Sequence, residues 1–345
     1  MNLTVRELQN HQNGEKIMIN NAYRPEGHLI NTQANKHNVA SLAALQYTMS
    51  RGTIIEGVVT SCDAQYNLHV DLNGIRGIIK AEDAQYCRPD ETWKGVALMK
   101  RVGKPVACKI VDIDVTGSEP LVKLSRRDVQ KECVENYHAK LMIGDIIPAR
   151  VTRTDTFGTF LDIGCGISAL MPIARSSLTR VNHTSERFHA DMDLYVIVDT
   201  IDPHNRRITV SLRELLGTWE ENAAMFHPGQ TVVGVLRQVE DYGVFIELTP
   251  NLTGLAEIPT GKTAEDLKEQ IGTNVPVYIK SVNPENMKIK LVILDDGVAK
   301  AQVTAPKYFV DCENVHHLTE WQYSPDCCIK KTVRTFFGDG FASET

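Results

Sequence analysis

The sequence predicts an all-β protein made of small five-stranded barrels in tandem, joined by short helices and flanked by N- and C-terminal extensions. Three observations predict this fold class. A block of residues recurs three times along the chain. Each block holds five short stretches with the alternation and turn residues of β-strands. A tight turn separates the first two stretches. Recurrence at a fixed spacing is typical of a protein built from repeated structural units.

The second and third copies of the block align without gaps. Residues 144–163 read GDIIPARVTRTDTFGTFLDI and residues 229–248 read GQTVVGVLRQVEDYGVFIEL, an offset of 85 residues. A looser copy at residues 51–72, RGTIIEGVVTSCDAQYNLHVDL, carries one inserted residue before its first aromatic ring. The constant offset indicates that one structural unit is used three times.

Each copy continues with an apolar patch and two further strands. The patches read GIRGIIKAED, GISALMPIA and NLTGLAEIP, and the last strands read PLVKLSRR, RRITVSLRE and NMKIKLVIL. Five strands with a tight turn between the first two match a Greek-key barrel, the OB-fold. The chain then divides into five parts. They are an N-terminal extension (1–50), a degenerate first barrel with its connector helix (51–137), a second barrel with its connector helix (138–222), a third barrel (223–296) and a C-terminal extension (297–345).

The segments outside the barrels carry weaker signals. A serine suited to N-capping begins each connector, Ser125 in SRRDVQKECVENYHAKL and Ser211 in SLRELLGTWEENAAMF, and Glu214 follows Ser211 by three residues. The N-terminal extension is rich in Asn, Gln and His, so we expect partial disorder there with a short helix around Val39–Met49. In the C-terminal extension, KYFVDC and IKKTVRTFF are candidate strands of a hairpin or of a small sheet.

The composition bounds the class of protein. Apolar residues make up 42% and charged residues 23%, as in globular proteins. The chain has no run of about 18 apolar residues, and its first twenty residues lack the apolar core of a signal peptide. Eight irregularly spaced cysteines fit reduced thiols better than a disulfide framework. We therefore expect a cytoplasmic protein with no membrane contact.

Aromatic rings recur on one face of the second strand of each repeat. Leu161 and Ile163 share one face of that strand, so Phe160 and Asp162 share the other. The same pattern pairs a ring with a carboxylate in the other two repeats, at Phe245 with Glu247 and at His69 with Asp71. A ring beside a carboxylate on a solvent-facing surface suggests a ligand, and stacking of a nucleobase contributes roughly 1–3 kcal/mol. The alternative is that these rings plug a barrel end or pack on a connector helix.

Basic residues accompany the rings and would bind the phosphates of a single-stranded RNA. The net charge of −6 argues against this interpretation, because binding by counterion release needs lysines and arginines that face phosphate. An ordinary solvated surface is the other explanation for these basic residues. The candidate RNA-binding residues are the rings Phe157, Phe160, Tyr242, Phe245, Tyr66 and His69, and the basic residues Arg150, Arg153, Arg206, Arg207, Arg237, Lys280, Lys288 and Lys290.

The motifs F-G-T-F-L-D-I-G at residues 157–164 and Y-G-V-F-I-E-L at 242–248 resemble the S1 domain, an OB-fold RNA-binding module. The resemblance covers about residues 51–295, and the triple arrangement with LLGTWEEN at 215–222 is similar to the shortened ribosomal-protein-S1-like proteins of clostridia and related Gram-positive bacteria. It implies binding of single-stranded mRNA and a role in translation with the small ribosomal subunit. By position, the RNA-contacting aromatics of the family fall on Phe157, Phe160, Tyr242 and Phe245, and its basic residues fall near Arg206, Arg207, Lys288 and Lys290.

The sequence also departs from the family pattern. Many members carry a histidine in the third strand where Pro172 and Glu257 stand here. The first repeat has Asn67 in place of the turn glycine and His69 in place of the second ring. We expect this repeat to bind RNA more weakly, with a possible adaptation to a protein partner.

An enzyme and a protein-interaction scaffold are the two other function classes for this chain. An enzyme is not expected, because no nucleophile–base signature, phosphate loop or paired-carboxylate motif is evident, and neither a cofactor nor a small-molecule substrate is implied. Zinc is not expected either, because the tail residues Cys312, His316, His317, Cys327 and Cys328 match no C-x-x-C spacing. A protein-interaction scaffold that docks on the ribosome or on an RNA-processing nuclease stays open as the alternative function.

Overall fold

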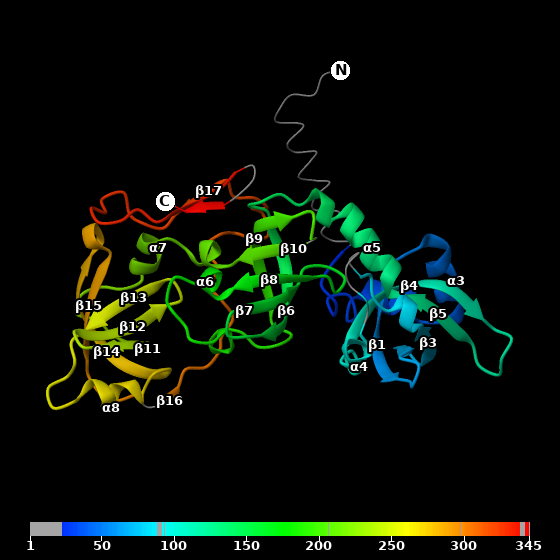
Figure 1. Cartoon of the computed structure of the whole chain (residues 1–345), viewed down its shortest axis with the longest axis horizontal. Coiled ribbons are helices and arrows are strands. Elements are labelled where there is room, and N and C mark those ends of the chain that lie inside the picture. The colour runs from blue at the N-terminus through cyan, green and yellow to red at the C-terminus, as the bar shows by residue number, and fades with distance from the viewer. Residues whose placement is uncertain are drawn as a thin grey trace, which may run out of the picture.

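The computed structural model describes residues 23–87, 92, 94–205, 207–297, 299–338 and 342–344. Three closed five-stranded barrels follow one another along the long axis of the molecule, with the helix α5 (Arg126–Asn136) between the first and the second (Figure 1). The predicted fold class, tandem OB-fold barrels joined by short helices, is confirmed. The candidate residue Arg206 lies outside the described residues.

The first barrel closes because its first strand pairs with both the second and the fourth. Its third and fifth strands run parallel, and every other pair in it is antiparallel. Alternate apolar side chains of these strands fill the interior, as the period of a strand requires. The elements are β1 (Ile55–Cys62), β2 (Leu68–Leu72), β3 (Ile75–Ile79), η1 (Ala81–Asp83), α4 (Gly95–Met99), β4 (Pro105–Asp114) and β5 (Leu121–Ser125).

The second and third barrels repeat this topology. In the third, pairing of the first and fourth strands closes the barrel, and a two-residue strand adds to its edge. The second barrel comprises β6 (Ile146–Thr154), β7 (Gly158–Asp162), β8 (Ser168–Pro172), α6 (Ile173–Ser176), η3 (Thr184–Glu186), β9 (Asp193–Asp202) and β10 (Arg207–Ser211). The third comprises β11 (Thr231–Glu240), β12 (Gly243–Thr249), β13 (Leu252–Ala256), α8 (Ala264–Lys268), β14 (Thr273–Asn283), η5 (Pro284–Asn286), β15 (Lys288–Ile293) and β16 (Ala299–Lys300).

The two connectors differ in their capping. The hydroxyl of Ser125 accepts from the Asp128 N–H at 3.1 Å, so the predicted cap of α5 is confirmed, and η2 (His138–Lys140) follows this helix. The prediction for Ser211 is wrong, because its hydroxyl donates to the Glu214 carboxylate and caps no helix. The second connector is η4 (Arg213–Leu216) and α7 (Trp219–Ala223). Gly217, at a φ of 85° that favours glycine, separates them, and Thr218 forms the capping box of α7 with Glu221.

The described part of the N-terminal extension is an ordered segment. Residues 23–50 include α2 (Gln33–Asn38) and most of α3 (Leu42–Arg51), which overlaps the short helix expected around Val39–Met49, while residues 1–22 lie outside the described part, so the expectation of partial disorder stays a prediction there. The segment is ordered because Val39 and Leu45 enter the core of the first barrel. In addition, the Asn35 side chain bonds the backbone N–H and carbonyl of Glu56.

The C-terminal extension bridges the second and third barrels. Residues 307–312 form no strand; they lie against the second barrel, where the Tyr308 hydroxyl accepts from the Tyr195 N–H at 2.9 Å. The expected hairpin between KYFVDC and IKKTVRTFF is therefore wrong. The strand in the second of these segments pairs instead with a strand that begins at Glu320. The small sheet comprises β17 (Glu320–Gln322), β18 (Arg334–Phe337) and β19 (Ala342–Glu344).

A buried glutamate and two arginines lie at each joint between neighbouring barrels. At the first joint, the carboxylate of Glu26 accepts from Arg126 at 2.6 and 3.0 Å and from Arg101 at 2.8 Å. The Glu26 backbone N–H donates to Asp162 of the second barrel at 2.8 Å. Burial alone would raise the pKa of Glu26, but the two guanidinium groups outweigh it and hold this pKa below its usual value.

At the second joint, the carboxylate of Glu247 in β12 accepts from Arg187 at 2.9 and 2.8 Å and from Arg237 at 2.7 Å. Arg187 belongs to the second barrel, and Arg237 also donates to Glu186 of that barrel at 2.6 Å. Ion pairs that cross the joint in both directions fix the third barrel against the second. Both joints are therefore specific, hydrogen-bonded contacts.

A second buried carboxylate of the first joint makes stability depend on pH. Glu56 accepts from the backbone N–H groups of Gly27, Leu29 and Ile30 at 2.9, 3.0 and 2.7 Å. Burial nevertheless raises its pKa from 4.5 to about 7. Between these two values the folded protein binds more protons at Glu56 than the unfolded chain does, so this residue lowers stability as the pH rises.

We predict that Glu56→Gln, which stays neutral, gains stability relative to the wild type as the pH rises from 4.5 to 7. Urea unfolding of both proteins at intervals across this range measures the difference in the free energy of unfolding. A difference that stays constant with pH would contradict a raised pKa at Glu56. The exposed Glu82, which forms a 3.9 Å ion pair with Lys80, provides the control substitution Glu82→Gln.

Candidate nucleic-acid interface

The second barrel carries a pair of perpendicular rings on its outer wall. Phe157 lies in the turn before β7 with 52% of its surface exposed, and Phe160 is half-buried in β7. Their centroids are 5.8 Å apart and the ring planes meet at 87°. Neither ring belongs to the core of the barrel. The structure therefore does not support the alternative in which these rings fill the interior.

The third barrel repeats the pair at the positions 85 residues further on. Tyr242 is 69% exposed and Phe245 is half-buried in β12. Their centroids are 6.1 Å apart, with an angle of 90° between the rings. Two barrels thus present the same edge-to-face pair at the same place in the fold.

A β-bulge sets the residue that lies over the ring. The register of β6 and β7 shifts between Val151 and Arg153, so that Arg153 lies directly opposite Phe160. Its guanidinium carbon is 4.4 Å from the ring centroid, a cation–π contact, and the side chain remains 62% exposed. The Arg153 guanidinium also lies 3.7 Å from the Asp155 carboxylate. In the third barrel, Gln238 is the residue opposite Phe245, so that barrel presents a ring pair without the arginine.

Strand pairing places several of the predicted basic residues on the wall that carries the rings. In the third barrel, Phe245 pairs with Leu255 and Leu255 pairs with Lys290, so these three side chains form one row across three strands. Lys288 lies two residues before Lys290 on the same face, and both lysines are exposed as predicted. In the second barrel the row is Phe160, Leu170 and Thr209. The exposed Arg207 lies two residues before Thr209, on the same face of β10. Lys280 is exposed in β14.

Two of the predicted phosphate-binding arginines are instead structural. Arg237 has a side chain only 6% exposed, held by Glu186 and Glu247 in the joint between barrels. Arg150 forms a two-point ion pair with Asp193 at 2.6 and 2.9 Å and also donates to the carbonyl of Glu26. The neighbouring barrel covers Arg237 and the N-terminal segment contacts Arg150, so the ion pairs in which the two side chains are held disfavour their predicted phosphate binding, which stays a prediction.

The prediction that the carboxylates beside the rings face solvent is wrong for Asp162 and Glu247, which are both buried. Asp162 accepts from the backbone N–H groups of Glu26, Gly164 and Gly166 at 2.8–3.0 Å, and burial together with the charge of Glu26 raises its pKa to about 7. Glu247 is buried at the second joint. In the first barrel, the equivalent Asp71 is exposed, as expected.

Within the residues that the structure describes, Tyr66 and His69 of the first barrel do not form the edge-to-face ring pair of the other two barrels. Tyr66 is partly exposed, but its ring packs against Gly95 at the start of α4. A Cβ atom at position 95 would lie only 2.3 Å from the Tyr66 ring. His69 is half-buried, and its Nε2 is 3.6 Å from the Asp63 carboxylate. Exposed apolar side chains surround this region of the barrel: Val96, Met99 and Val102. These side chains give the first barrel an exposed apolar surface beside Tyr66.

A groove between the first and second barrels was missed by the sequence analysis. It encloses about 490 Å³, and Phe160 and Arg153 of the second barrel line it together with Lys100 and Lys104 of the first. The lysines lie in the run KRVGK at residues 100–104, which was the signal available in the sequence. The placement of one barrel against the other was needed to bring them beside the rings.

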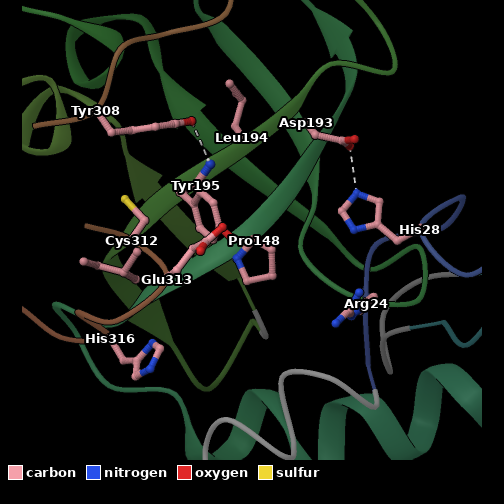
Figure 2. Close-up of a pocket in the computed structure, with 11 residues that line it drawn as sticks. Arg24, His28, Pro148, Asp193, Leu194, Tyr195, Tyr308, Cys312, Glu313 and His316 are labelled. Carbon is pink, nitrogen blue, oxygen red and sulfur yellow. Dashed lines mark hydrogen bonds and ion pairs between the residues drawn. The ribbon is translucent and has the colours of Figure 1, made fainter. Parts of the chain in front are cut away.

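A second cavity of about 440 Å³ lies between the N-terminal segment, β9 and the C-terminal extension. In Figure 2 the Tyr308 hydroxyl accepts a hydrogen bond from the Tyr195 backbone N–H at one side of this cavity. At another side of it, the His28 ring contacts the Asp193 carboxylate. Cys312 and His316 line this cavity, whereas His317 is paired with Asp145. The described part of the chain contains no group of three or more His, Cys, Asp or Glu side chains arranged to hold a metal ion.

Among the described residues, the helices are all too short or too polar to cross a membrane.

The fold and its surface define a class: a chain of OB-fold barrels with perpendicular ring pairs on the outer walls of two of them. Residues 140–213 contain all five strands of the second barrel, and they match the family described as S1 RNA binding domain. The second barrel is therefore an S1 domain, as the motif at 157–164 predicted.

About three-quarters to four-fifths of the chain is similar to the small ribosomal subunit protein bS1. It is 27% identical to the protein of Staphylococcus aureus over 292 residues, which cover 79% of this chain and 70% of the relative. It is 25% identical to that of Pseudomonas aeruginosa over 263 residues. This alignment covers 74% of this chain but only 46% of the relative. For Leuconostoc lactis the identity is 22%, with 80% of this chain and 64% of the relative covered. The chain thus spans about half to two-thirds of the length of these relatives.

Among solved structures, a multidomain protein with nucleic acid binding domains from Streptococcus pneumoniae is 14% identical to the chain. The match covers 71% of this chain and 74% of that one, with a TM-score of 0.23. This overall likeness is too low to support an argument about function.

We predict losses of stability of very different size for the two arginines of the barrel walls. Arg237→Ala should cost about 3–5 kcal/mol, because it leaves Glu247 buried with one partner fewer. Arg153→Ala should lower the free energy of unfolding by at most about 1 kcal/mol, because it removes only an exposed cation–π contact. Urea unfolding of the second and third barrels measures both. Equal losses would contradict the assignment of Arg237 to the joint and of Arg153 to the open surface.

Proposed function

We propose that this protein binds single-stranded RNA, mRNA in particular, through its second and third barrels, and that it acts in translation with the small ribosomal subunit. The observation that carries the proposal is the repeated pair of exposed, perpendicular rings at equivalent places in two barrels. The S1 match of the second barrel and the similarity to bS1 support it. We infer a binding protein of the cytoplasm and assign it no catalytic role.

The geometry of the ring pairs suits a nucleobase. In an edge-to-face contact, the ring whose edge makes the contact keeps both of its own faces free of its partner. An unpaired base can stack on such a face, and every base offers one, so little base specificity is expected beyond a mild preference for unpaired A/U-rich RNA. Arg153, Arg207, Lys288 and Lys290 supply positive charge for the phosphates on the same walls.

The barrels act together through linkage. Once the second barrel holds a strand of RNA, the third meets the same strand at high effective concentration, because the joint at Glu247 fixes one barrel against the other. Each barrel can therefore bind weakly while the chain binds tightly. A long single strand should bind far better than one that reaches only one ring pair.

We predict that Phe160→Ala combined with Phe245→Ala weakens RNA binding far more than either change alone. Loss of one stacked base costs roughly 1–3 kcal/mol, and loss of both also removes the linkage. Fluorescence anisotropy with a labelled unstructured RNA measures the affinities. Tyr47→Ala is the matched control, because Tyr47 is an exposed ring under an arginine, Arg51, outside the barrel walls. Unchanged affinity in a folded double variant would refute the stacking model.

The apolar surface of the first barrel favours a second candidate function for that barrel. Met99 and Val102 line a cavity of about 480 Å³ together with Tyr66, and the exposed Val96 lies on the same helix as Met99, which suits docking on a protein of the ribosome or on an RNA-processing nuclease. Salt titration separates the two functions for the whole chain. An RNA binder loses affinity for RNA steeply as salt rises, whereas a pure scaffold shows little affinity for RNA at any salt concentration. Sedimentation with 30S particles then tests docking directly.

A further inference from the structure

The groove between the first and second barrels continues directly from the ring pair of the second. Phe160 and Arg153 form one wall together with Thr152 of β6 and Ser168 of β8. The opposite wall comes from the first barrel, where Lys100 directly follows α4 and Lys104 precedes β4. A chain that stacks a base on Phe160 therefore has a path along this groove toward the first barrel.

The charges in the groove favour an anion. Of its cations, Arg101 is paired with Glu26 and Arg150 is paired with Asp193. The side chains of Lys100, Lys104 and Arg153 are exposed to solvent. The one exposed carboxylate among the lining residues is that of Asp191.

The two remaining acidic groups of the groove face inward. Glu26 is enclosed by Arg126 and Arg101, and Asp162 is satisfied by three backbone N–H groups. The positive charge of Lys100, Lys104 and Arg153 is thus opposed by Asp191 in the lining of the groove and by Asp155, which lies 3.7 Å from Arg153. A polyanion meets a net attraction there.

We propose that the RNA strand stacked on Phe160 continues into this groove, and that Lys100 and Lys104 of the first barrel bind its backbone phosphates. This inference rests on the proposed function of the second barrel. It gives the first barrel a part in RNA binding that needs no ring pair: it is the phosphate-binding wall of a site whose base-stacking wall belongs to its neighbour.

The first joint is what makes a shared site physically reasonable. Glu26 links Arg101, one residue after Lys100, to Arg126 through its carboxylate and to Asp162 of the second barrel through its backbone. Because Arg101 and Asp162 both line the groove, the contact that joins the barrels also sets the width of the groove. The joint thus places Lys100 and Lys104 in the same groove as Phe160.

The test is the salt dependence of RNA binding by the full chain carrying Lys100→Gln and Lys104→Gln together. Each lost phosphate contact should lower the slope of log K against log salt by about 0.7 for a single strand. The double variant should therefore lose about 1.4 from that slope and bind on the order of tenfold more weakly at low salt. Arginine at both positions should restore binding, because the charge is retained.

The matched control is Lys131→Gln with Lys140→Gln. It removes the same charge from exposed positions on the connector that do not line the groove, and it should change neither the slope nor the affinity. Equal losses in both double variants would reduce the effect to net charge and overturn the inference. If the Phe160 and Phe245 variants lose affinity while the Lys100 and Lys104 variant matches the wild type, the inference fails and the proposed function stands. If the wild type does not bind the RNA, both fail.

Discussion

Burial of one glutamate carboxylate between two arginines, at each joint, is the interaction on which the arrangement of this chain depends. Glu26 is held by Arg126 and Arg101 at the first joint, and Glu247 by Arg187 and Arg237 at the second. Such groups tolerate the loss of a partner poorly, because a charge left buried and unpaired is costly. The barrels are thereby fixed in relative position, which is what allows binding surfaces on different barrels to act on one ligand.

The repeat explains how one strand serves two purposes. Asp162 and Glu247 occupy the same place in their barrels, two residues after the second ring. Each accepts a hydrogen bond from a residue earlier in the chain, Asp162 from the Glu26 N–H and Glu247 from Arg187. Asp71 occupies that place in the first barrel and is exposed. The ring and the carboxylate share one strand, but the ring serves the ligand while the carboxylate serves the neighbouring barrel. This division follows from the tandem order of the barrels.

The sequence was sufficient for the barrels, their order and the ring pairs, because strand alternation and a constant offset are local signals. It missed the ion pairs that hold Arg150 and Arg237, because the outer wall of one barrel can be covered by its neighbour, and no local pattern reveals that. It failed for Lys100 and Lys104 for the same reason. The amide-rich composition of the N-terminal extension concealed Glu26, whose importance rests on three partners distant in the chain. In the second connector, the spacing of Thr218 and Glu221 is that of a capping box, and this local pattern marks the start of α7.

The most direct measurement of the central claim is photocrosslinking of the full chain to an unstructured RNA that carries 4-thiouridine, with the crosslinked residues located by mass spectrometry. If bases stack on the walls of the second and third barrels, the crosslinks fall on Phe157, Phe160, Tyr242 and Phe245. Crosslinks confined to the first barrel or to the C-terminal extension, with none at these rings, would contradict the account.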